Sequence, residues 1–374
     1  MPLQKPFDSA RGCGKEFSTR VVQSGVRFDR ATGAISVPIY QTATFSHPSL
    51  GLSTGYDYTR TGNPTRQAAE EVLADLEGGF AAFCFASGLA ALTAVFMLFK
   101  SGDHLLLGED LYGGTYRLLN SVFARFGIVA SYVDTTDPAL VEASLKDNTK
   151  ALLFESPSNP MLKLSDIKSI ADICKKRGVL TVVDNTLLTP YLQRPLELGC
   201  DIVVHSATKY LGGHSDLLAG VVVAGNENIA REVAFIQNAC GPVLAPNECW
   251  LLLRGLKTLS IRLDRQQHNS VIMANWLKEH PKVEEVYYPG IGAMISFRLK
   301  SAESAAQVLE KVRIISFAES LGGVESLITY PLLQTHPEVP EETRLRLGID
   351  DRLLRLSVGI EHISDLCADL NQAL

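Results

Sequence analysis

Hydrophobic and polar positions along residues 61–255 alternate between two patterns. Short runs that are apolar at nearly every position are typical of strands buried on both faces, and the longer segments between them are typical of helices. This alternation predicts a mostly parallel sheet covered by helices on both faces. The expected strands are His104–Leu107, Ala151–Phe154, Leu180–Val183 and Ile202–Val204, and the expected helices are Gln67–Leu76, Leu89–Phe99 and Leu164–Arg177.

The pattern predicts a second, smaller domain after about residue 255. The segment Ile229–Leu263, expected to be helical with a break at Gly241-Pro242, leads into it. Helical and alternating segments follow, so we expect a small antiparallel sheet with helices on one face. The expected helices are Ser270–His280 and Ser304–Val312, and the expected strands are Ala293–Leu299 and Ile314–Phe317.

Residues 1 to about 60 are rich in Gly, Ser, Thr and Pro and show only weak periodicity. This composition is typical of an extended segment rather than of a core element. We therefore expect an N-terminal arm over residues 1–60, an α/β domain over 61–255 and an α+β domain over 256–374.

Composition narrows the class of protein. The 374 residues can bury a large core and are enough for two domains. The net charge is -6 and no basic run could follow a phosphate backbone, so no nucleic-acid partner is expected. The N-terminus has no apolar leader segment, and no stretch reaches the roughly 18 apolar residues of a membrane span. Seven cysteines without a Cys-x-x-Cys pair indicate free thiols, no metal site and a cytoplasmic location.

Candidate chemistry lies just after two of the expected strands. Lys209 follows the run Ile202–Val204, and Asp184 follows Leu180–Val183. In open parallel sheets, ligands bind at the carboxyl ends of the strands. A single lysine in a polar loop is usually a solvated charge. However, a lysine that can form a Schiff base, with an aspartate that keeps a pyridinium nitrogen protonated, is the pair required by a pyridoxal 5'-phosphate (PLP) enzyme.

A phosphate cradle is predicted at the start of the helix after residue 86. Ser87 and Gly88 open the apolar run that continues from Leu89. Free N–H groups and the positive end of the helix dipole would therefore face the phosphate. Ser206 and Thr208, which are close to Lys209 in the sequence, could add hydroxyl donors.

At these residues the sequence resembles the Cys/Met-metabolism PLP enzymes. This family includes cystathionine γ-synthase, cystathionine β- and γ-lyases, methionine γ-lyase and O-acylhomoserine sulfhydrylase. The resemblance extends from about Val21 to Leu374 and rests on motifs at residues 56–66, 184–186, 206–214 and 319–326. It implies the α/β fold type I of PLP-dependent transferases, with a mostly parallel seven-stranded sheet domain and a smaller α+β C-terminal domain.

The resemblance implies roles for residues that composition alone explains more simply. By composition Tyr58 and Arg60 form a surface pair, but the resemblance implies that they reach the phosphate of a neighbouring subunit's cofactor, which suits an arginine fork. Tyr112 beside a glycine turn is more often a packing residue, whereas its family equivalent stacks on the cofactor ring. Asn159 lies in a proline-bounded turn, and the resemblance places it near the cofactor's phenolic oxygen and the substrate carboxylate.

Arg355 stands in an otherwise apolar expected strand, 353–359. Because an unpaired buried charge is costly, this arginine must have a partner. Within the same domain the partner would be Glu361 or an aspartate. The resemblance implies instead that Arg355 holds the substrate α-carboxylate bidentately, with help from Ser320.

Three charged residues match family positions near the far end of the substrate. Asp57, Arg117 and Glu319 would suit the amino and carboxylate groups of a cysteine nucleophile. They could equally form a surface salt-bridge set of little energetic value. Thr61 stands where some succinyl-using γ-synthases carry a second arginine, which favours an acetyl ester as the donor.

Together these residues predict an enzyme that acts on amino acids. Lys209 would remove the α-proton and later move a proton from Cβ, with Tyr112 as a second acid or base. The leading hypothesis is γ-replacement on an O-acylhomoserine, most like the bacterial cystathionine γ-synthases that also use sulfide. The alternatives are cystathionine β- or γ-elimination, a methionine γ-lyase-like activity, which Gly114 in place of a cysteine disfavours, and a non-catalytic protein. The resemblance also implies a homotetramer built from two active dimers.

Overall fold

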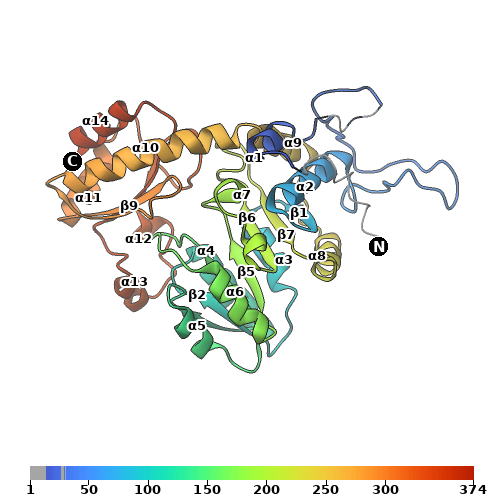
Figure 1. Ribbon diagram of the computed structural model, residues 1–374, viewed down its shortest axis with the longest axis horizontal. Coiled ribbons are helices and arrows are strands. Elements are labelled where there is room, and N and C mark those ends of the chain that lie inside the picture. Colours follow the sequence, from blue (N-terminus) through green and yellow to red (C-terminus); the bar gives the residue numbers. More distant parts are fainter. Residues whose placement is uncertain (1–13, 27–28, 30) are drawn as a thin grey trace.

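The computed structural model describes residues 14–26, 29 and 31–374, which form two sheet-containing parts joined by a long helix (Figure 1). Within these residues, the larger part has a seven-stranded sheet in the order β1-β7-β6-β5-β4-β2-β3. Strand β7 is antiparallel to β1 and β6, and the other neighbours are parallel. The fold class is therefore confirmed. The strands are β1 (Ala81–Phe85), β2 (His104–Gly108), β3 (Val129–Val133), β4 (Thr149–Glu155), β5 (Leu180–Asp184), β6 (Ile202–Ser206) and β7 (Gly220–Ala224).

Helices cover both faces of this sheet because successive strand residues point to opposite sides and are apolar on both. In β6, Val203 packs in one core cluster with residues of α2 and α9, whereas Ile202 and Val204 pack in another with residues of α3 and α8. The strands and helices expected between residues 67 and 204 are present with slightly shifted ends. The helices are α2 (Pro64–Glu77), α3 (Gly88–Phe96), α4 (Gly113–Arg117), α5 (Pro138–Ser144), α6 (Ile167–Lys176), α7 (Thr189–Leu192), α8 (Glu227–Cys240) and α9 (Pro246–Leu256).

The smaller part contains a second sheet in the order β10-β11-β12-β9-β8. Its β9 and β12 side chains pack on one face against α10, α11 and α14, as expected. The antiparallel prediction is wrong for one pair, because β10 and β11 run parallel. The chain leaves the sheet between them in the loop 318–326 and re-enters in the same direction. The elements are β8 (Val283–Tyr287), β9 (Met294–Leu299), α11 (Ala302–Lys311), β10 (Ser316–Phe317), β11 (Leu327–Thr329), α12 (Pro331–Gln334), α13 (Glu341–Leu347), β12 (Leu353–Ser357) and α14 (Ile363–Ala373).

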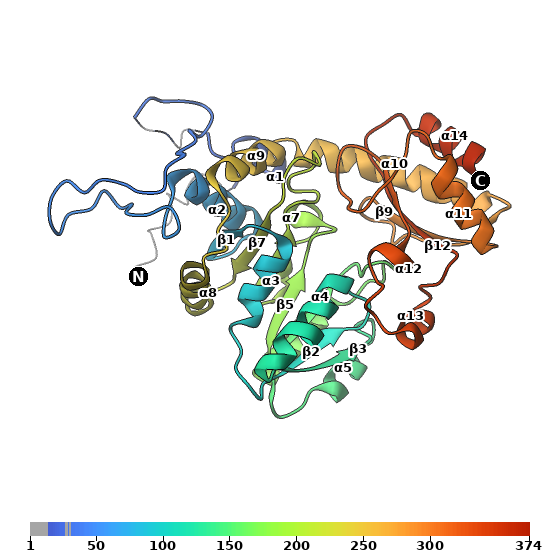
Figure 2. The ribbon, with the colours of Figure 1, turned by 180° about the vertical axis from the view of Figure 1, so that it is seen from behind.

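The helical region after residue 226 differs from the prediction. Besides the break near Gly241-Pro242, the chain breaks again after α9, and the expected helix Ser270–His280 is only the end of α10 (Leu259–Glu279). Two polar side chains of α10 lie between the expected helical segments Ile229–Leu263 and Ser270–His280, and both are buried and form hydrogen bonds. Gln266 donates to the carbonyl of Gly323, and Asn269 donates to carbonyls in the turn after β12. As Figure 2 shows, α10 runs along both parts of the molecule.

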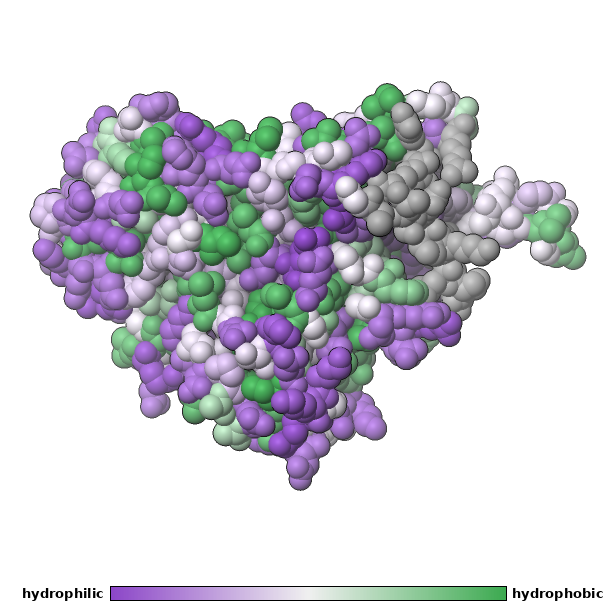
Figure 3. Space-filling view, viewed as in Figure 1, coloured by the Kyte–Doolittle hydropathy of each residue, from purple (hydrophilic) through white to green (hydrophobic). Residues whose placement is uncertain are grey.

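The described part of the expected arm contains α1 (Phe17–Val22), which packs against the body, and then an extended segment that projects from the molecule (Figure 1). Leu50 and Leu52 on this segment are exposed, and Figure 3 shows hydrophobic side chains at the end of the projection. Of the seven cysteines, Cys13 lies outside the described residues, and the other six are free. Among the helices of the described residues, none has the length and apolarity needed to span a membrane.

Candidate active site

The ends of β5 and β6 bring the two predicted cofactor residues to one edge of the large sheet. Asp184 is the last residue of β5, and Lys209 lies in the turn after β6, where its N–H donates to the carbonyl of Ser206. The Lys209 Nζ donates to the Ser320 hydroxyl at 2.6 Å. Burial, followed by the positive charge of Arg355, lowers the pKa of Lys209 to about 8. A larger fraction of this amine is therefore neutral and nucleophilic than in an ordinary lysine.

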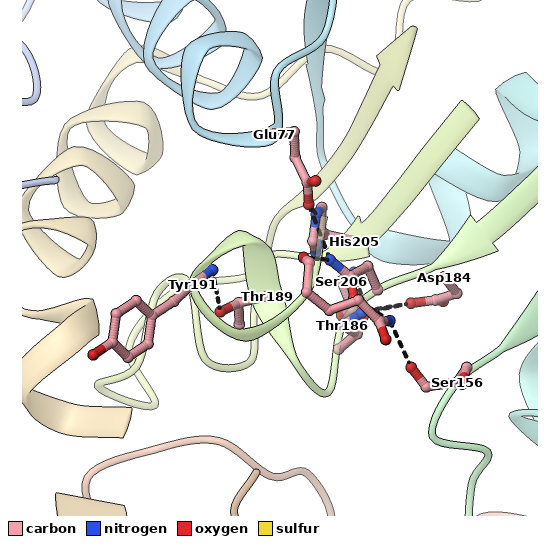
Figure 4. Close-up of polar contacts among 10 residues, drawn as sticks. Glu77, Ser156, Asp184, Thr186, Thr189, Tyr191, His205 and Ser206 are labelled. Atoms are coloured by element: carbon pink, nitrogen blue, oxygen red, sulfur yellow. Dashed lines mark hydrogen bonds and ion pairs between the residues drawn. The ribbon is translucent and has the colours of Figure 1, made fainter. Parts of the chain in front are cut away.

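Hydrogen bonds fix the orientation of the Asp184 carboxylate. The backbone N–H and the hydroxyl of Thr186 both donate to its Oδ1, at 3.0 and 2.5 Å (Figure 4). Burial raises the pKa of Asp184, and the two hydrogen bonds and the nearby His205 oppose that shift. Among the described residues, no hydrogen bond is formed by Oδ2, so this oxygen can accept a proton-bearing ring nitrogen.

Ser87 and Gly88, the residues predicted to cradle the phosphate, stand at the start of α3. The Ser87 hydroxyl accepts the N–H of Ala90 at 3.1 Å, so the helix begins where the sequence predicted. A Cβ at Gly88 would lie 2.9 Å from the Ser206 Cβ, so the first turn of α3, with Leu89, lies against Ser206. The Thr208 hydroxyl, also predicted to bind the phosphate, donates to the Ala219 carbonyl and accepts the Ala219 N–H.

Glu155 is a site residue that the sequence analysis missed. It ends β4 directly opposite Asp184 of β5, and its buried Oε1 accepts the Tyr112 N–H at 2.8 Å. Burial and the charge of Asp184 raise the pKa of Glu155 well above its usual range. Two adjacent buried carboxyls do not ionise together. Because Thr186 stabilises the anion on Asp184, the proton resides on Glu155. Its position after an apolar strand, like that of Asp184, was the available signal.

Tyr112 precedes α4, and its ring lies over Gly114. A Cβ at Gly114 would approach the ring to 2.4 Å. Tyr112 is 38% exposed, which leaves part of its surface open to a ligand. Burial raises the pKa of Tyr112, and the nearby charges of Arg117 and Glu319 act on the phenol in opposite directions. Its hydroxyl is therefore a protonated donor at neutral pH.

Arg355 is buried in the middle of β12, and neither partner expected within its own domain contacts it. It donates to the side-chain oxygen of Asn159 at 2.7 Å and to the carbonyl of Ser320 at 3.3 Å. Glu361 instead accepts from Ser326. The Arg355 Nε is buried and has no hydrogen-bond partner within the described part of the chain. A buried cation with unmet donors is suited to bind a carboxylate.

Ser320 lies between the two cations of the site. Its hydroxyl accepts from Lys209 and its carbonyl accepts from Arg355. Its backbone has a positive φ of 96°, which a non-glycine residue rarely adopts. The loop 318–326 therefore places this residue where a bound amino acid would meet both Lys209 and Arg355.

The residues predicted for the far end of the substrate are divided, because Arg117 and Glu319 lie near Tyr112 whereas Asp57 lies on the arm. Arg117 forms an ion pair with Glu338 at 2.6 Å rather than with Glu319. Asp57 lies on the arm, where it accepts from Ser53 and contacts His47. These contacts match the surface-pair alternative within one chain.

Tyr58 and Arg60 also lie on the arm. The Arg60 guanidinium stacks 5.6 Å from the centre of the Tyr58 ring and donates to the backbone and side chain of Asn238 on α8. Among the described residues, no hydrogen bond or ion pair joins either residue to Lys209 or Asp184. Within one chain, the Arg60 side chain therefore joins the arm to α8.

The residues along this sheet edge suit the binding of PLP. A buried lysine of lowered pKa, a carboxylate with one free oxygen and an open helix start lie along one sheet edge. Nowhere in residues 14–26, 29 and 31–374 does a group of three or more His, Cys, Asp or Glu side chains gather to hold a metal ion.

Comparison with known proteins supports this assignment. The sequence model described as "Cys/Met metabolism PLP-dependent enzyme" matches residues 18–374. The chain is 49% identical over 372 residues to cystathionine gamma-lyase of Bacillus subtilis (strain 168), covering 95% of this chain and 98% of the relative. It is 51% identical over 356 residues to cystathionine gamma-synthase/O-acetylhomoserine (thiol)-lyase of the same organism, covering 95% of each. It is 48% identical to a Lactococcus lactis cystathionine beta-lyase, with 95% and 98% coverage.

Solved structures that are similar to this chain indicate the same family. Cystathionine gamma-lyase from Lactobacillus plantarum complexed with L-serine superposes with a TM-score of 0.94 at 45% identity, covering 96% of this chain and 98% of that one. Cystathionine gamma synthase from Xanthomonas oryzae pv. oryzae in complex with aminoacrylate and cysteine has a TM-score of 0.93 at 40% identity, with 96% and 97% coverage. The predicted family resemblance and the PLP cofactor are confirmed.

Proposed function

The chain belongs to the Cys/Met metabolism PLP-dependent enzyme family, and we propose that it catalyses γ-replacement on an O-acylhomoserine. Cysteine as the nucleophile would give cystathionine, and sulfide would give homocysteine. The observation that carries the proposal is the Lys209 amine beside Ser320, whose carbonyl also binds Arg355. This arrangement sets a proton-transferring amine next to a carboxylate site. The 51% identity to the B. subtilis protein with a γ-synthase name supports the choice of reaction.

The cofactor would lie along the sheet edge. Asp184 would accept the ring nitrogen, Tyr112 would cover the ring, and Ser87, Gly88, Leu89 and Ser206 would surround the phosphate. When bound through Lys209, PLP supplies an electron sink for charge that develops at the substrate Cα.

One group of residues would bind the substrate, and a second group would transfer its protons. Arg355, Asn159 and Ser320 would hold the α-carboxylate and direct the Cα proton toward Lys209. The Lys209 Nζ would take that proton and then move a proton from Cβ, which makes the bond from Cγ to its substituent labile. A pKa of about 8 for the free amine suits such transfers near neutral pH. Tyr112 would serve as the second acid or base.

The alternative is C–S elimination from cystathionine, because relatives at 48–49% identity are named as lyases. The two reactions use the same core residues and differ at the far end of the substrate. There, Thr61 carries no charge and Arg117 is paired with Glu338, which supports O-acetylhomoserine rather than the succinyl ester as the donor. Gly114, covered by the Tyr112 ring, has no thiol and does not support a methionine γ-lyase-like activity.

Product analysis separates these reactions. The holoenzyme is supplied with O-acetylhomoserine or O-succinylhomoserine plus cysteine or sulfide, and separately with cystathionine alone. We expect cystathionine and homocysteine from the acetyl ester in preference to the succinyl ester. Rapid pyruvate from cystathionine, with negligible condensation from either ester, would establish a β-lyase instead, and 2-oxobutanoate would establish a γ-lyase.

The proposed assembly is a homotetramer of two active dimers, in which Asp57, Tyr58 and Arg60 of each arm complete the neighbouring site. The exposed Tyr58 ring and the exposed apolar side chains of the arm support this proposal. A cytoplasmic location is also proposed, supported by the six free cysteines of the described residues.

A further inference from the structure

A buried histidine outside the proposed catalytic set joins two of the functional loops. His336 follows α12 and is 1% exposed. Its Nε2 lies 3.2 Å from the carbonyl of Leu111, the residue before Tyr112, and 3.1 Å from the carbonyl of Asn159. One ring nitrogen of the smaller part therefore contacts both loops of the larger part that carry proposed ligand-binding side chains.

The hydrogen bonds define the protonation of this ring. Carbonyl oxygens only accept, so Nε2 carries the proton that it shares between them. Nδ1 lies 2.7 Å from the Thr335 hydroxyl, which can donate to it. The ring is thus a neutral Nε2–H tautomer with both nitrogens bonded.

The segment that carries His336 is fixed on both sides. Its N–H donates to the Pro331 carbonyl, and its own carbonyl accepts from Val339. A Cβ at Gly113 would lie 2.2 Å from the Thr335 carbonyl oxygen, so this segment packs directly on the start of α4. Figures 1 and 2 both show α12 beside α4. The histidine therefore has little freedom to follow a loop that moves.

Asn159 receives a second contact from the same side, because Arg355 donates to its side-chain oxygen. Its backbone and side chain are thus held by two different donors of the smaller part. Tyr112 is held in a similar way, by Glu155 at its own N–H and by His336 at the preceding carbonyl.

We propose that His336 is a positioning residue which ties the Tyr112 loop to Asn159 and thereby sets the geometry in which the amino-acid substrate is bound. This inference rests on the proposed binding of the substrate carboxylate by Arg355 and Asn159. It does not depend on which C–S reaction follows. The phosphate cradle at α3 lies outside the contacts of His336, so binding of the cofactor and binding of the amino acid should respond differently to its loss.

Acid is expected to weaken the hydrogen bonds through which His336 joins the two loops. Burial, followed by the charge of Arg355 on β12, lowers the pKa of His336 to about 4, and Glu338 of the same segment opposes the shift. The adjoining β2–α4 and β4–α6 loops present carbonyl groups to the ring. The unfolded chain binds a proton near pH 6.5 and the folded chain only near 4. The stability contributed by the neutral ring is therefore complete above 6.5 and is lost progressively as pH falls toward 4.

The test compares holoenzyme variants His336→Leu, His336→Gln and, as a matched control on the same segment, Leu333→Ala, whose side chain is exposed. Glutamine keeps an N–H donor near the position of Nε2, and leucine keeps volume without a donor. Glycine, which has no substituent to eliminate, serves as the amino-acid probe. Its affinity is measured from the change that it causes in the absorbance of the bound cofactor, and PLP affinity is measured separately on each apoenzyme.

We expect His336→Leu to weaken glycine binding by about tenfold or more, because small displacements of binding groups have large effects. PLP affinity should change by less than about threefold, and His336→Gln and Leu333→Ala should bind glycine like the wild type. Unchanged glycine affinity in His336→Leu would overturn the proposal. Equal losses of glycine and PLP affinity, or a His336→Gln variant as weak as His336→Leu, would also overturn it.

A second measurement does not require His336→Leu to fold. Between pH 7 and 5, the melting temperature of the wild-type holoenzyme should fall by about 2 °C more than that of His336→Gln, which has no titrating ring. If the melting temperatures of the two proteins fell equally with pH across this range, a neutral, hydrogen-bonded His336 ring would be contradicted. Because glycine binding and melting involve no C–S chemistry, failure of the γ-replacement proposal would leave both tests interpretable.

Discussion

Two regions of the molecule differ in how many of their contacts lie within one chain: the floor of the candidate site, which consists of Lys209, Asp184 and Glu155, and the N-terminal arm. On the floor, Lys209, Asp184 and Glu155 are held by short hydrogen bonds along adjacent strand ends. On the arm, the exposed side chains of Tyr58 and Arg60 stack on each other, and Arg60 donates to Asn238 near the end of α8. The contacts of the floor are therefore complete within one chain, while the arm residues are proposed to act in the site of a neighbouring chain.

The charged groups near Arg117 are intermediate between the floor and the arm in their exposure to solvent. They lie at the mouth of the site, but the Arg117–Glu338 pair is about half exposed. Exposed pairs contribute little energy and are easily exchanged for another partner. Substitutions on the floor, on the arm and at the mouth are therefore expected to differ in the size of their effects.

The largest effect is expected on the floor. Lys209→Ala should lower turnover with the natural substrate by about 10⁴-fold or more, because the covalent attachment and the proton transfers at Cα and Cβ are lost together. The yellow absorbance of lysine-bound PLP should also disappear. Turnover and the absorbance spectrum check this expectation, and an alanine variant with normal turnover would show that the lysine has been assigned wrongly.

A smaller, conditional effect is expected for the arm. Lys209→Ala and Arg60→Ala chains should each be inactive alone, but a mixed dimer contains one site with both residues. An equal mixture should therefore recover about one quarter of wild-type activity if subunits assort randomly. Activity is measured after mixing, and mass spectrometry of tagged chains verifies exchange. No recovery despite verified exchange would mean that the arm does not complete a neighbouring site.

The smallest effect is expected at the mouth. Glu338→Gln frees Arg117, so acceptance of O-succinylhomoserine relative to O-acetylhomoserine should rise by about two- to fivefold, in keeping with the modest energy of an exposed ion pair. The ratio of kcat/KM for the two esters measures it. Arg117→Gln is the matched control and should remove the gain in the double variant. An unchanged ratio would show that Arg117 does not contact the acyl group.

Local sequence signals predicted much of the fold and the floor. Apolar runs ending in Asp184, or followed by Lys209, located the strand ends, and Ser87 located the start of α3. The same signal would have found Glu155, which also ends an apolar run, but its proline-rich surroundings favoured a turn. The boundary expected inside α10 was wrong because the partners of its polar residues are carbonyls far away in the sequence.

The sequence by itself determined which residues lie at the carboxyl edge of the large sheet, because strand periodicity and helix capping depend on neighbours along the chain. Only the tertiary structure decided the partners of those residues. Arg355 bonds to Asn159 rather than to Glu361, Arg117 pairs with Glu338, and His336 joins two loops of the other part. Such contacts arise where the two parts of the molecule pack together, and a side chain has several candidates of suitable charge along the sequence. Geometry selects among them, since hydrogen bonds form only between groups that the packed backbone holds within about 3 Å of each other.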